Sequence, residues 1–150
     1  MRISKRMIAT IGVVVGCLGL AVPTSPGQES PRPERVEIPA TATTLEGIPT
    51  VRVDSAEGGT TRQVLSPSEA AKSRLTVGLV DGRYYWTSRG NRPLEMSSSG
   101  EFTYLSSEPG QYIRFTRLND KISYVEHVEN KDLGSGSVTW WGEMKIVSGK

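Results

Sequence analysis

The sequence predicts an all-β fold: a small antiparallel meander that forms a barrel or a sandwich, with one short helix before the main sheet and an N-terminal export signal. Two observations carry this prediction. From Leu75 onward, short alternating apolar runs recur about every ten residues and are separated by turn signals. All the aromatic residues lie between Tyr84 and Trp141, which places the expected core in this part of the chain.

Residues 1–22 have the parts of a secretory signal. Arg2, Lys5 and Arg6 form a basic head, and Met7–Val22 follows as a run without charge. A membrane-spanning helix needs about 20 apolar residues, which is longer than this run. We therefore expect a cleaved signal peptide, with an uncleaved N-terminal anchor as the alternative.

Cys17, the only cysteine, lies inside that segment. Val14-Val15-Gly16-Cys17 resembles the lipobox of bacterial lipoproteins, in which the cysteine becomes the lipidated first residue, although the residues after it stay apolar. Lipidation at Cys17 is therefore an alternative to cleavage after Ala21 or after Gly27, where small residues precede the bond. Cleavage at either of these bonds leaves a chain without cysteine, and such a chain has no disulfide or thiolate ligand.

The formal net charge of +2 overstates how basic the exported part is. Three of the 18 basic residues lie in the signal and all 16 acidic residues follow it, so 15 basic and 16 acidic side chains remain. A nucleic-acid-binding domain needs a basic patch or stripe. We therefore expect no nucleic-acid partner.

Proline usage divides the rest of the chain. Six of the nine prolines fall in the first 49 residues, and residues 23–47 show no apolar periodicity. We expect a Pro-rich disordered leader there, because such sequences stay extended and bury little apolar surface. The β domain is expected at residues 48–147, with a tail at 148–150.

The domain is expected to begin with a hairpin, Ile48–Leu65. Ser66-Pro67-Ser68-Glu69 then combines an N-cap serine, a proline at the first helical position and the acid of a capping box. The helix that begins here should end near Ser73 or Arg74, because the alternation of a strand follows at once.

Six meander strands are expected after this helix. Asp81-Gly82 is a strong two-residue hairpin signal between the first two strands. The expected strands are Leu75–Val80, Arg83–Thr87, Glu101–Ser106, Gln111–Arg117, Lys121–Val128 and Val138 to about Val147, with a loop at Arg89–Pro93.

Two aromatic pairs carry the site hypothesis, Tyr84-Tyr85 and Trp140-Trp141. Neighbouring side chains of a strand point to opposite faces, so each pair should put one ring in the core and one outside it. We expect Tyr85 and Trp141 to be the outer rings and to form a binding surface. The alternative is that other elements cover these second rings.

Arg89 and Arg92 lie close to the first pair in the sequence. Guanidinium groups bind carboxylates and phosphates and stack on aromatic rings, so we expect both to contribute to the binding surface. The alternative is a solvated loop in which these arginines pair with neighbouring acidic residues.

No cofactor, metal site or catalytic residue is expected. His127 is the only histidine, and a zinc site needs three or four ligands. The sequence contains no G-x-S-x-G nucleophile elbow and no phosphate-binding loop. An enzyme therefore has little support from the sequence.

The expected function is that of an exported, non-catalytic β domain of the bacterial cell envelope. It would bind an unknown ligand or envelope protein through Tyr85, Trp141, Arg89 and Arg92, in the periplasm, at the cell surface or outside the cell. Membrane contact would come only from the N-terminal segment. A closed meander of about eight strands can also enclose a small apolar ligand, so a lipocalin-like barrel is the second hypothesis and an uncharacterised envelope enzyme is the third.

Overall fold

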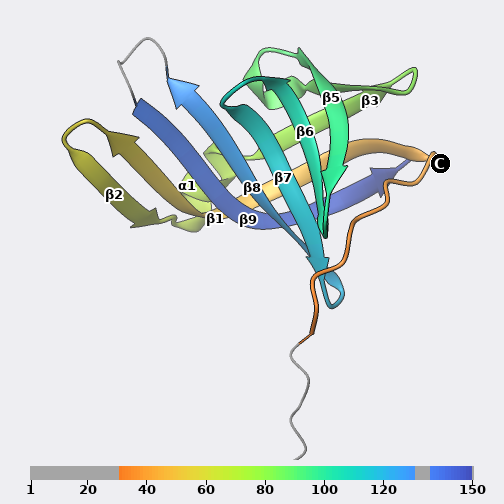
Figure 1. Cartoon of the computed structure of the whole chain (residues 1–150), viewed down its shortest axis with the longest axis horizontal. Coiled ribbons are helices and arrows are strands. Elements are labelled where there is room, and N and C mark those ends of the chain that lie inside the picture. Colours follow the sequence, from red (N-terminus) through yellow and green to blue (C-terminus); the bar gives the residue numbers. More distant parts are fainter. Residues whose placement is uncertain (1–30, 131–135, 150) are drawn as a thin grey trace, which may run out of the picture. The chain divides into compact units, whose positions relative to one another are not determined.

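The computed structural model describes residues 31–130 and 136–149, which form an antiparallel β structure with one short α-helix (Figure 1). The predicted export signal, with Cys17, lies outside the described residues. The elements are β1 (Ala42–Ala56), β2 (Gly59–Val64), α1 (Pro67–Lys72), β3 (Leu75–Val80), β4 (Arg83–Trp86), the 3-10 helix η1 (Thr87–Arg89), β5 (Arg92–Ser99), β6 (Phe102–Glu108), β7 (Gln111–Leu118), β8 (Lys121–Asn130) and β9 (Gly136–Ser148).

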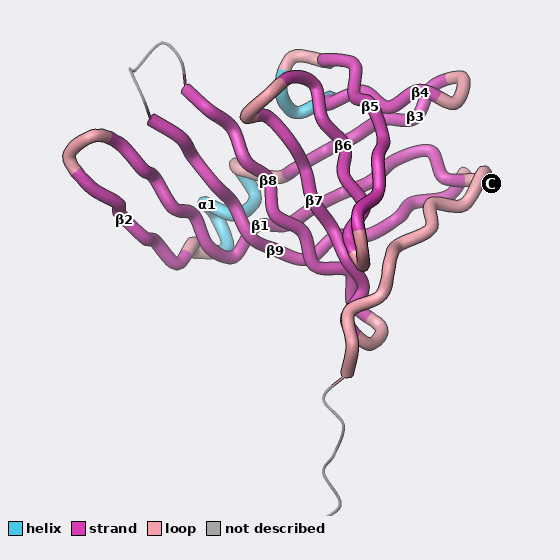
Figure 2. Tube along the Cα trace, viewed as in Figure 1, coloured by secondary structure: helices cyan, strands magenta, loops and turns pink. Residues whose placement is uncertain are grey.

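Eight of these strands close into a barrel, which confirms the all-β prediction and selects the barrel over the sandwich (Figure 2). The sheet order is β2-β1-β3-β4-β5-β6-β7-β8-β9, and β9 pairs back onto β1. Neighbouring strands are antiparallel throughout. The first and last strands of the described structure therefore form the seam of the barrel.

The strand β2 lies outside the closed barrel. Its partner is Val51–Ala56, the second half of β1, whereas β3 pairs with Thr44–Gly47 in the first half. Both lie on the same side of β1, because β9 pairs along the other side over nearly its whole length. A register shift between Pro49 and Val51 separates the two halves, and beyond it β1 continues as an open sheet that ends at β2.

Local sequence signals account for the first meander turn and for the helix. Asp81 and Gly82 have φ angles of 51° and 74°, as a two-residue type I′ hairpin requires. The Ser66 hydroxyl accepts from the backbone N–H of Glu69, and the Glu69 carboxylate accepts from that of Ser66. Hydrogen bonds from Ser66 lower the pKa of Glu69. The predicted hairpin turn and capping box are both confirmed.

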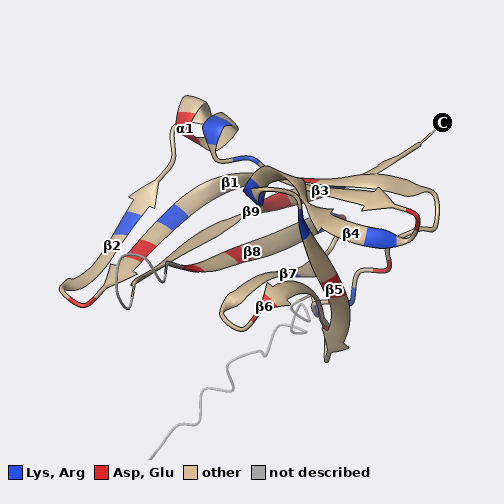
Figure 3. Cartoon of the chain, turned by 90° about the horizontal axis from the view of Figure 1, so that it is seen from above, with Lys and Arg blue, Asp and Glu red and all other residues tan. Residues whose placement is uncertain are grey.

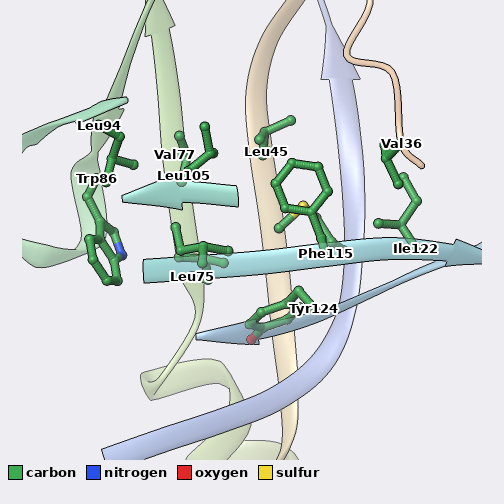
Figure 4. Close-up of a cluster of buried hydrophobic side chains, with 12 residues drawn as sticks. Val36, Leu45, Leu75, Val77, Trp86, Leu94, Leu105, Phe115, Ile122 and Tyr124 are labelled. Carbon is green, nitrogen blue, oxygen red and sulfur yellow. The ribbon is translucent and has the colours of Figure 1, made fainter. Parts of the chain in front are cut away.

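Apolar side chains fill the barrel interior (Figure 4). The largest are Trp86, Phe115 and Tyr124, each at most 1% exposed. The others are Val36, Leu45, Leu75, Val77, Leu94, Leu105, Ile113, Ile122 and Met144. An eight-stranded barrel has an interior just wide enough for side chains to fill. This filling gives no support to the hypothesis of a ligand held inside the barrel.

The chain before β1 packs against one end of the barrel. Val36 is 3% exposed in the core, and its carbonyl accepts a hydrogen bond from the Thr103 hydroxyl at 3.1 Å. Glu34 and Arg117 exchange two backbone hydrogen bonds of 2.8 Å. The guanidinium of Arg35 donates to the carbonyl of Gly100, between β5 and β6. These contacts attach the segment to the ends of β6 and β7.

Two strands differ from the sequence prediction. β1 begins at Ala42 rather than Ile48, so the expected boundary between leader and domain lies inside a strand. The reason is Leu45, which is fully buried in the barrel although its neighbours are polar. β5 occupies residues expected in a loop or left unassigned, and Leu94 is its only buried residue, so its sequence carries little apolar alternation.

Candidate functional site

Tyr85 and Trp141 both point outward, but from separate parts of the barrel wall. Tyr84 and Trp86 pack into the core on either side of Tyr85, so the Tyr85 ring faces out from β4. Trp141 is 37% exposed on β9, where its neighbours are β1 and β8. Since β1 and β3 lie between β9 and β4 in the closed sheet, the two rings do not share one surface.

Arg89 and Arg92 lie at the end of the barrel where β4 ends and β5 begins. The Arg89 guanidinium lies 4.7 Å from the ring centroid of Trp140, the inner member of the second aromatic pair. Arg92 donates to the Gln111 side-chain oxygen at 2.7 Å and pairs with Glu108 at 3.5 Å. The structure therefore brings both arginines to groups of the protein itself, and not to the outer rings.

A buried carboxylate, which the sequence analysis did not single out, lies at the same end. Glu126 is fully buried on the inner face of β8. Its Oε1 accepts from the Trp86 indole N–H at 3.1 Å, and Arg89 contacts both carboxylate oxygens at 3.1 Å. Burial raises the pKa of Glu126, while the charge of Arg89 and these hydrogen bonds oppose that shift. With both oxygens engaged, Glu126 is not placed to act as a base.

Trp140 lies between two guanidinium groups beside this ion pair. Arg89 is 4.7 Å and Arg52 is 5.8 Å from its ring centroid, and Arg52 is paired with Asp54 at 2.6 Å. Cation–π contacts of this kind are favourable when they are partly shielded from water. In the described part of the chain, both guanidinium groups have a carboxylate partner, Asp54 for Arg52 and Glu126 for Arg89. The contacts of Trp140 with these groups give its ring a structural role.

The only histidine also has structural partners. The ring of His127 stacks on Tyr112 with centroids 5.2 Å apart, and its Nδ1 lies 2.9 Å from the Thr139 hydroxyl. Both partners are its direct cross-strand neighbours on the outer face. These contacts fix the His127 ring between its neighbours on β7 and β9.

A row of cross-strand neighbours crosses the outer face of the sheet at the level of Trp141, and we call it the outer row. Residues directly opposite each other in adjacent strands point to the same face, so the pairings define the row. Val64 is 68% exposed and Trp141 is 37% exposed. From β2 to β6, through β1, β9, β8 and β7, the row is Val64, Val51, Trp141, Val125, Arg114 and Tyr104.

A hollow of about 420 Å³ lies beside the outer row. Trp141 and Phe102 both line it, and small side chains such as Thr116 and Ser123 lie between their strands. The Arg114 guanidinium is 4.7 Å from the Phe102 ring centroid. A surface hollow bordered by large aromatic side chains can accept a side chain of a protein partner.

The described part of the chain shows no metal centre. In residues 31–130 and 136–149, no three His, Cys, Asp or Glu side chains are grouped to hold a metal ion. No helix within these ranges has the length and apolar character needed to cross a bilayer. Comparison of the chain with known protein families, curated proteins and solved structures found no match.

Proposed function

We propose that this chain is an exported, non-catalytic binding domain of the bacterial cell envelope and that its outer row binds a protein partner. The observation that carries the proposal is Trp141, which remains 37% exposed between apolar neighbours on both adjacent strands. Export rests on the N-terminal sequence. The proposal retains Trp141 from the predicted site and places the other contacts on new residues.

The composition of the outer row supports a protein partner. Interface residues that carry most of the binding free energy are most often Trp, Tyr and Arg, and the row contains Trp141, Tyr104 and Arg114. Apolar Val51 and Val125 flank Trp141 on the same face. Single exposed apolar residues are ordinary, but a contiguous set is typical of an interaction site.

The other predicted residues support this function less. Arg89 is bound to Glu126, and Arg92 is bound to Gln111, so both guanidinium groups already have partners. Tyr85 is outward and therefore serves as the matched comparison for Trp141. The partners of Glu126 and His127 also explain these two residues without catalysis.

The proposal is tested by photo-crosslinking in the native cell envelope. A photoreactive p-benzoylphenylalanine replaces Trp141 in one variant and Tyr85 in the other, since both are outward aromatic positions on different parts of the wall. We expect a light-dependent adduct with one protein from position 141 and none from position 85. Adducts from position 85 alone, equal adducts from both positions, or none from either would contradict the proposal.

A further inference from the structure

In the described structure, β2 is the one strand of the sheet with a neighbour on one side only. The other strands lie within the closed barrel and have a neighbour on both sides, although Glu95–Ser99 of β5 pairs with β6 alone. All six residues of β2 are exposed. An unprotected edge presents free N–H and C=O groups to which another extended chain can bind.

The orientation of β2 is set by a hydrogen bond at its end. The Leu65 N–H donates to the Thr50 carbonyl at 2.9 Å, so Leu65 faces β1. Alternate residues of an antiparallel strand direct their backbone groups to opposite sides. The N–H and C=O groups of Thr60, Arg62 and Val64 therefore point to the free edge.

The same three residues carry their side chains on the face of the outer row. Val64 is opposite Val51, which is opposite Trp141, and Arg62 lies two positions from Val64 on the same face. A strand added to β2 would therefore continue the outer row by one more side chain. This links the free edge to the surface that the proposed function uses.

We propose that β2 binds an extended segment of the protein partner as an added antiparallel strand, with an apolar residue opposite Val64 and an acidic residue opposite Arg62. The inference rests on the proposed function and specifies the form of its partner. Peptides that bind by strand addition gain affinity from backbone hydrogen bonds and specificity from alternate side chains. Because the added strand is antiparallel, the apolar residue precedes the acidic residue by two positions.

Charge and exposure select these two residue types. Arg62 is the only charged residue of β2, which carries one basic band in Figure 3, and no ion pair joins it to another described residue. A carboxylate opposite it would supply that pair. An apolar side chain opposite Val64, which is 68% exposed, would cover it from the edge. β2 also contains no proline and no lysine, the residues that commonly protect edges.

A second copy of this chain fits the edge less well. Symmetric pairing of two β2 strands with matching faces can centre on Thr61, Arg62 or Gln63, which puts Arg62 opposite Thr60, Arg62 or Val64 of the second copy. β2 contains no acidic residue, so none of these registers supplies a carboxylate to Arg62, and the one centred on Arg62 opposes like charges. One six-residue strand also buries less area than a stable dimer needs.

The inference is tested with defined peptides and the full exported protein. The probe is the fluorescein-labelled peptide KTTVTETTK, and its control, KTTVTKTTK, differs only in the charge to be placed opposite Arg62. Fluorescence anisotropy should show the first peptide binding about tenfold more tightly, and Arg62→Glu should reverse the preference. Equal binding of the two peptides, or a preference that Arg62→Glu leaves unchanged, would overturn the inference.

Backbone methylation tests strand addition independently of charge. N-methylation of the valine and the acidic residue of the probe should abolish binding, because these amides face β2. N-methylation of the two threonines that flank the acidic residue should leave binding intact, because these amides face away from β2. If both methylated peptides bind equally, the peptide does not add to the sheet.

The outcomes separate this inference from the proposed function. An adduct from position 141 without any peptide preference would retain the function and reject the edge. A preference for the acidic peptide without an adduct from position 141 would retain the strand-addition site on β2 and reject the proposed function of the outer row. A dimer detected by sedimentation that dissociates in Arg62→Pro, which removes an N–H of the free edge and leaves the pairing of β2 with β1, would overturn the inference by assigning the edge to a second copy.

Discussion

The Arg89 guanidinium contacts both oxygens of Glu126, with Nε 3.1 Å from Oε1 and Nη2 3.1 Å from Oε2. Glu126 is fully buried and the Arg89 side chain is 27% exposed, so the arginine covers the carboxylate from the solvent side. Arg89 ends η1, whereas Glu126 belongs to β8, 37 residues later in the chain. The pair therefore attaches η1 to the barrel interior.

Removing the arginine should destabilise the fold strongly. Arg89→Gln leaves Glu126 buried without its counter-charge, and breaking a pair of this kind costs about 3 kcal/mol or more. Burial already raises the pKa of Glu126, and the variant loses the charge that opposes this shift. The folded state then binds the proton more tightly than the unfolded state, so stability falls as pH rises through the folded pKa.

The measurement is urea unfolding of both proteins at a series of pH values that begins near the ordinary pKa of a glutamate and rises from there. The difference between wild type and Arg89→Gln should be larger at the higher pH. Lys121→Gln is the matched control, because both members of its ion pair with Glu143 are exposed and surface pairs contribute about 0–1 kcal/mol. Equal losses in the free energy of unfolding for the two variants would show that the buried ion pair stabilises the fold no more than a surface pair does.

Tyr124→Phe should leave stability unchanged or raise it. The Tyr124 hydroxyl is buried and has no hydrogen-bond partner within the described structure, and burial raises its pKa. Removing an unsatisfied buried polar group removes its desolvation cost, which is about 1–3 kcal/mol. Thermal unfolding measures the change, and a loss above about 1 kcal/mol would show that the hydroxyl does have a partner.

Gly47 should not tolerate a side chain. A Cβ there would lie 2.7 Å from Cε1 and 2.8 Å from Cζ of the buried Tyr124 ring, and 3.0 Å from Leu75 Cβ. Overpacking of this kind costs about 1–3 kcal/mol. Gly58→Ala is the control, since nothing lies within 4 Å of its Cβ, and it should stay within about 0.5 kcal/mol of wild type. Chemical denaturation of both variants decides the comparison.

Substitutions of the two adjacent tryptophans should have different effects, one mainly on stability and the other mainly on partner binding. Trp140→Ala removes the ring that contacts Arg89 and Arg52 on the inner face, and should cost on the order of 3 kcal/mol. Trp141→Ala acts on the outer row and should cost less while reducing partner capture. Denaturation curves measure the first effect, and co-purification from the envelope measures the second. A larger stability loss for Trp141→Ala would place that ring among the structural residues.

The elements predicted from local chemistry are confirmed where one or two residues determine the backbone. Asp81-Gly82 adopts the positive φ angles of its turn type, and Ser66 with Glu69 forms the capping box. β5 was missed because only Leu94 is buried among polar neighbours. The start of β1 was missed because its one strong apolar residue, Leu45, lies in a stretch that otherwise reads as leader.

The site could be predicted only in part. Strand alternation correctly indicated that one ring of each aromatic pair points outward, and Trp141 is exposed. No local pattern indicated that Tyr85 and Trp141 are separated by β1 and β3, because strand order is a property of the closed sheet. Glu126 had a signal in the sequence: it occupies an inward position of β8 between Tyr124 and Val128. Its partner Arg89 is 37 residues away, so the pair itself was not predictable.

The seam between β1 and β9 sets an order on folding as the chain is made. The Thr43 hydroxyl donates to the Val147 carbonyl, 104 residues later, whereas each strand from β4 to β9 pairs with the one before it. Sequential hairpins form from contacts close in the chain, but closure waits for the last strand. Until β9 has emerged, β1 keeps an open edge along nearly its whole length. A chain truncated before β9 would therefore expose two unpaired strand edges, one on β1 and one on β8. Such a chain would aggregate rather than form a smaller soluble domain.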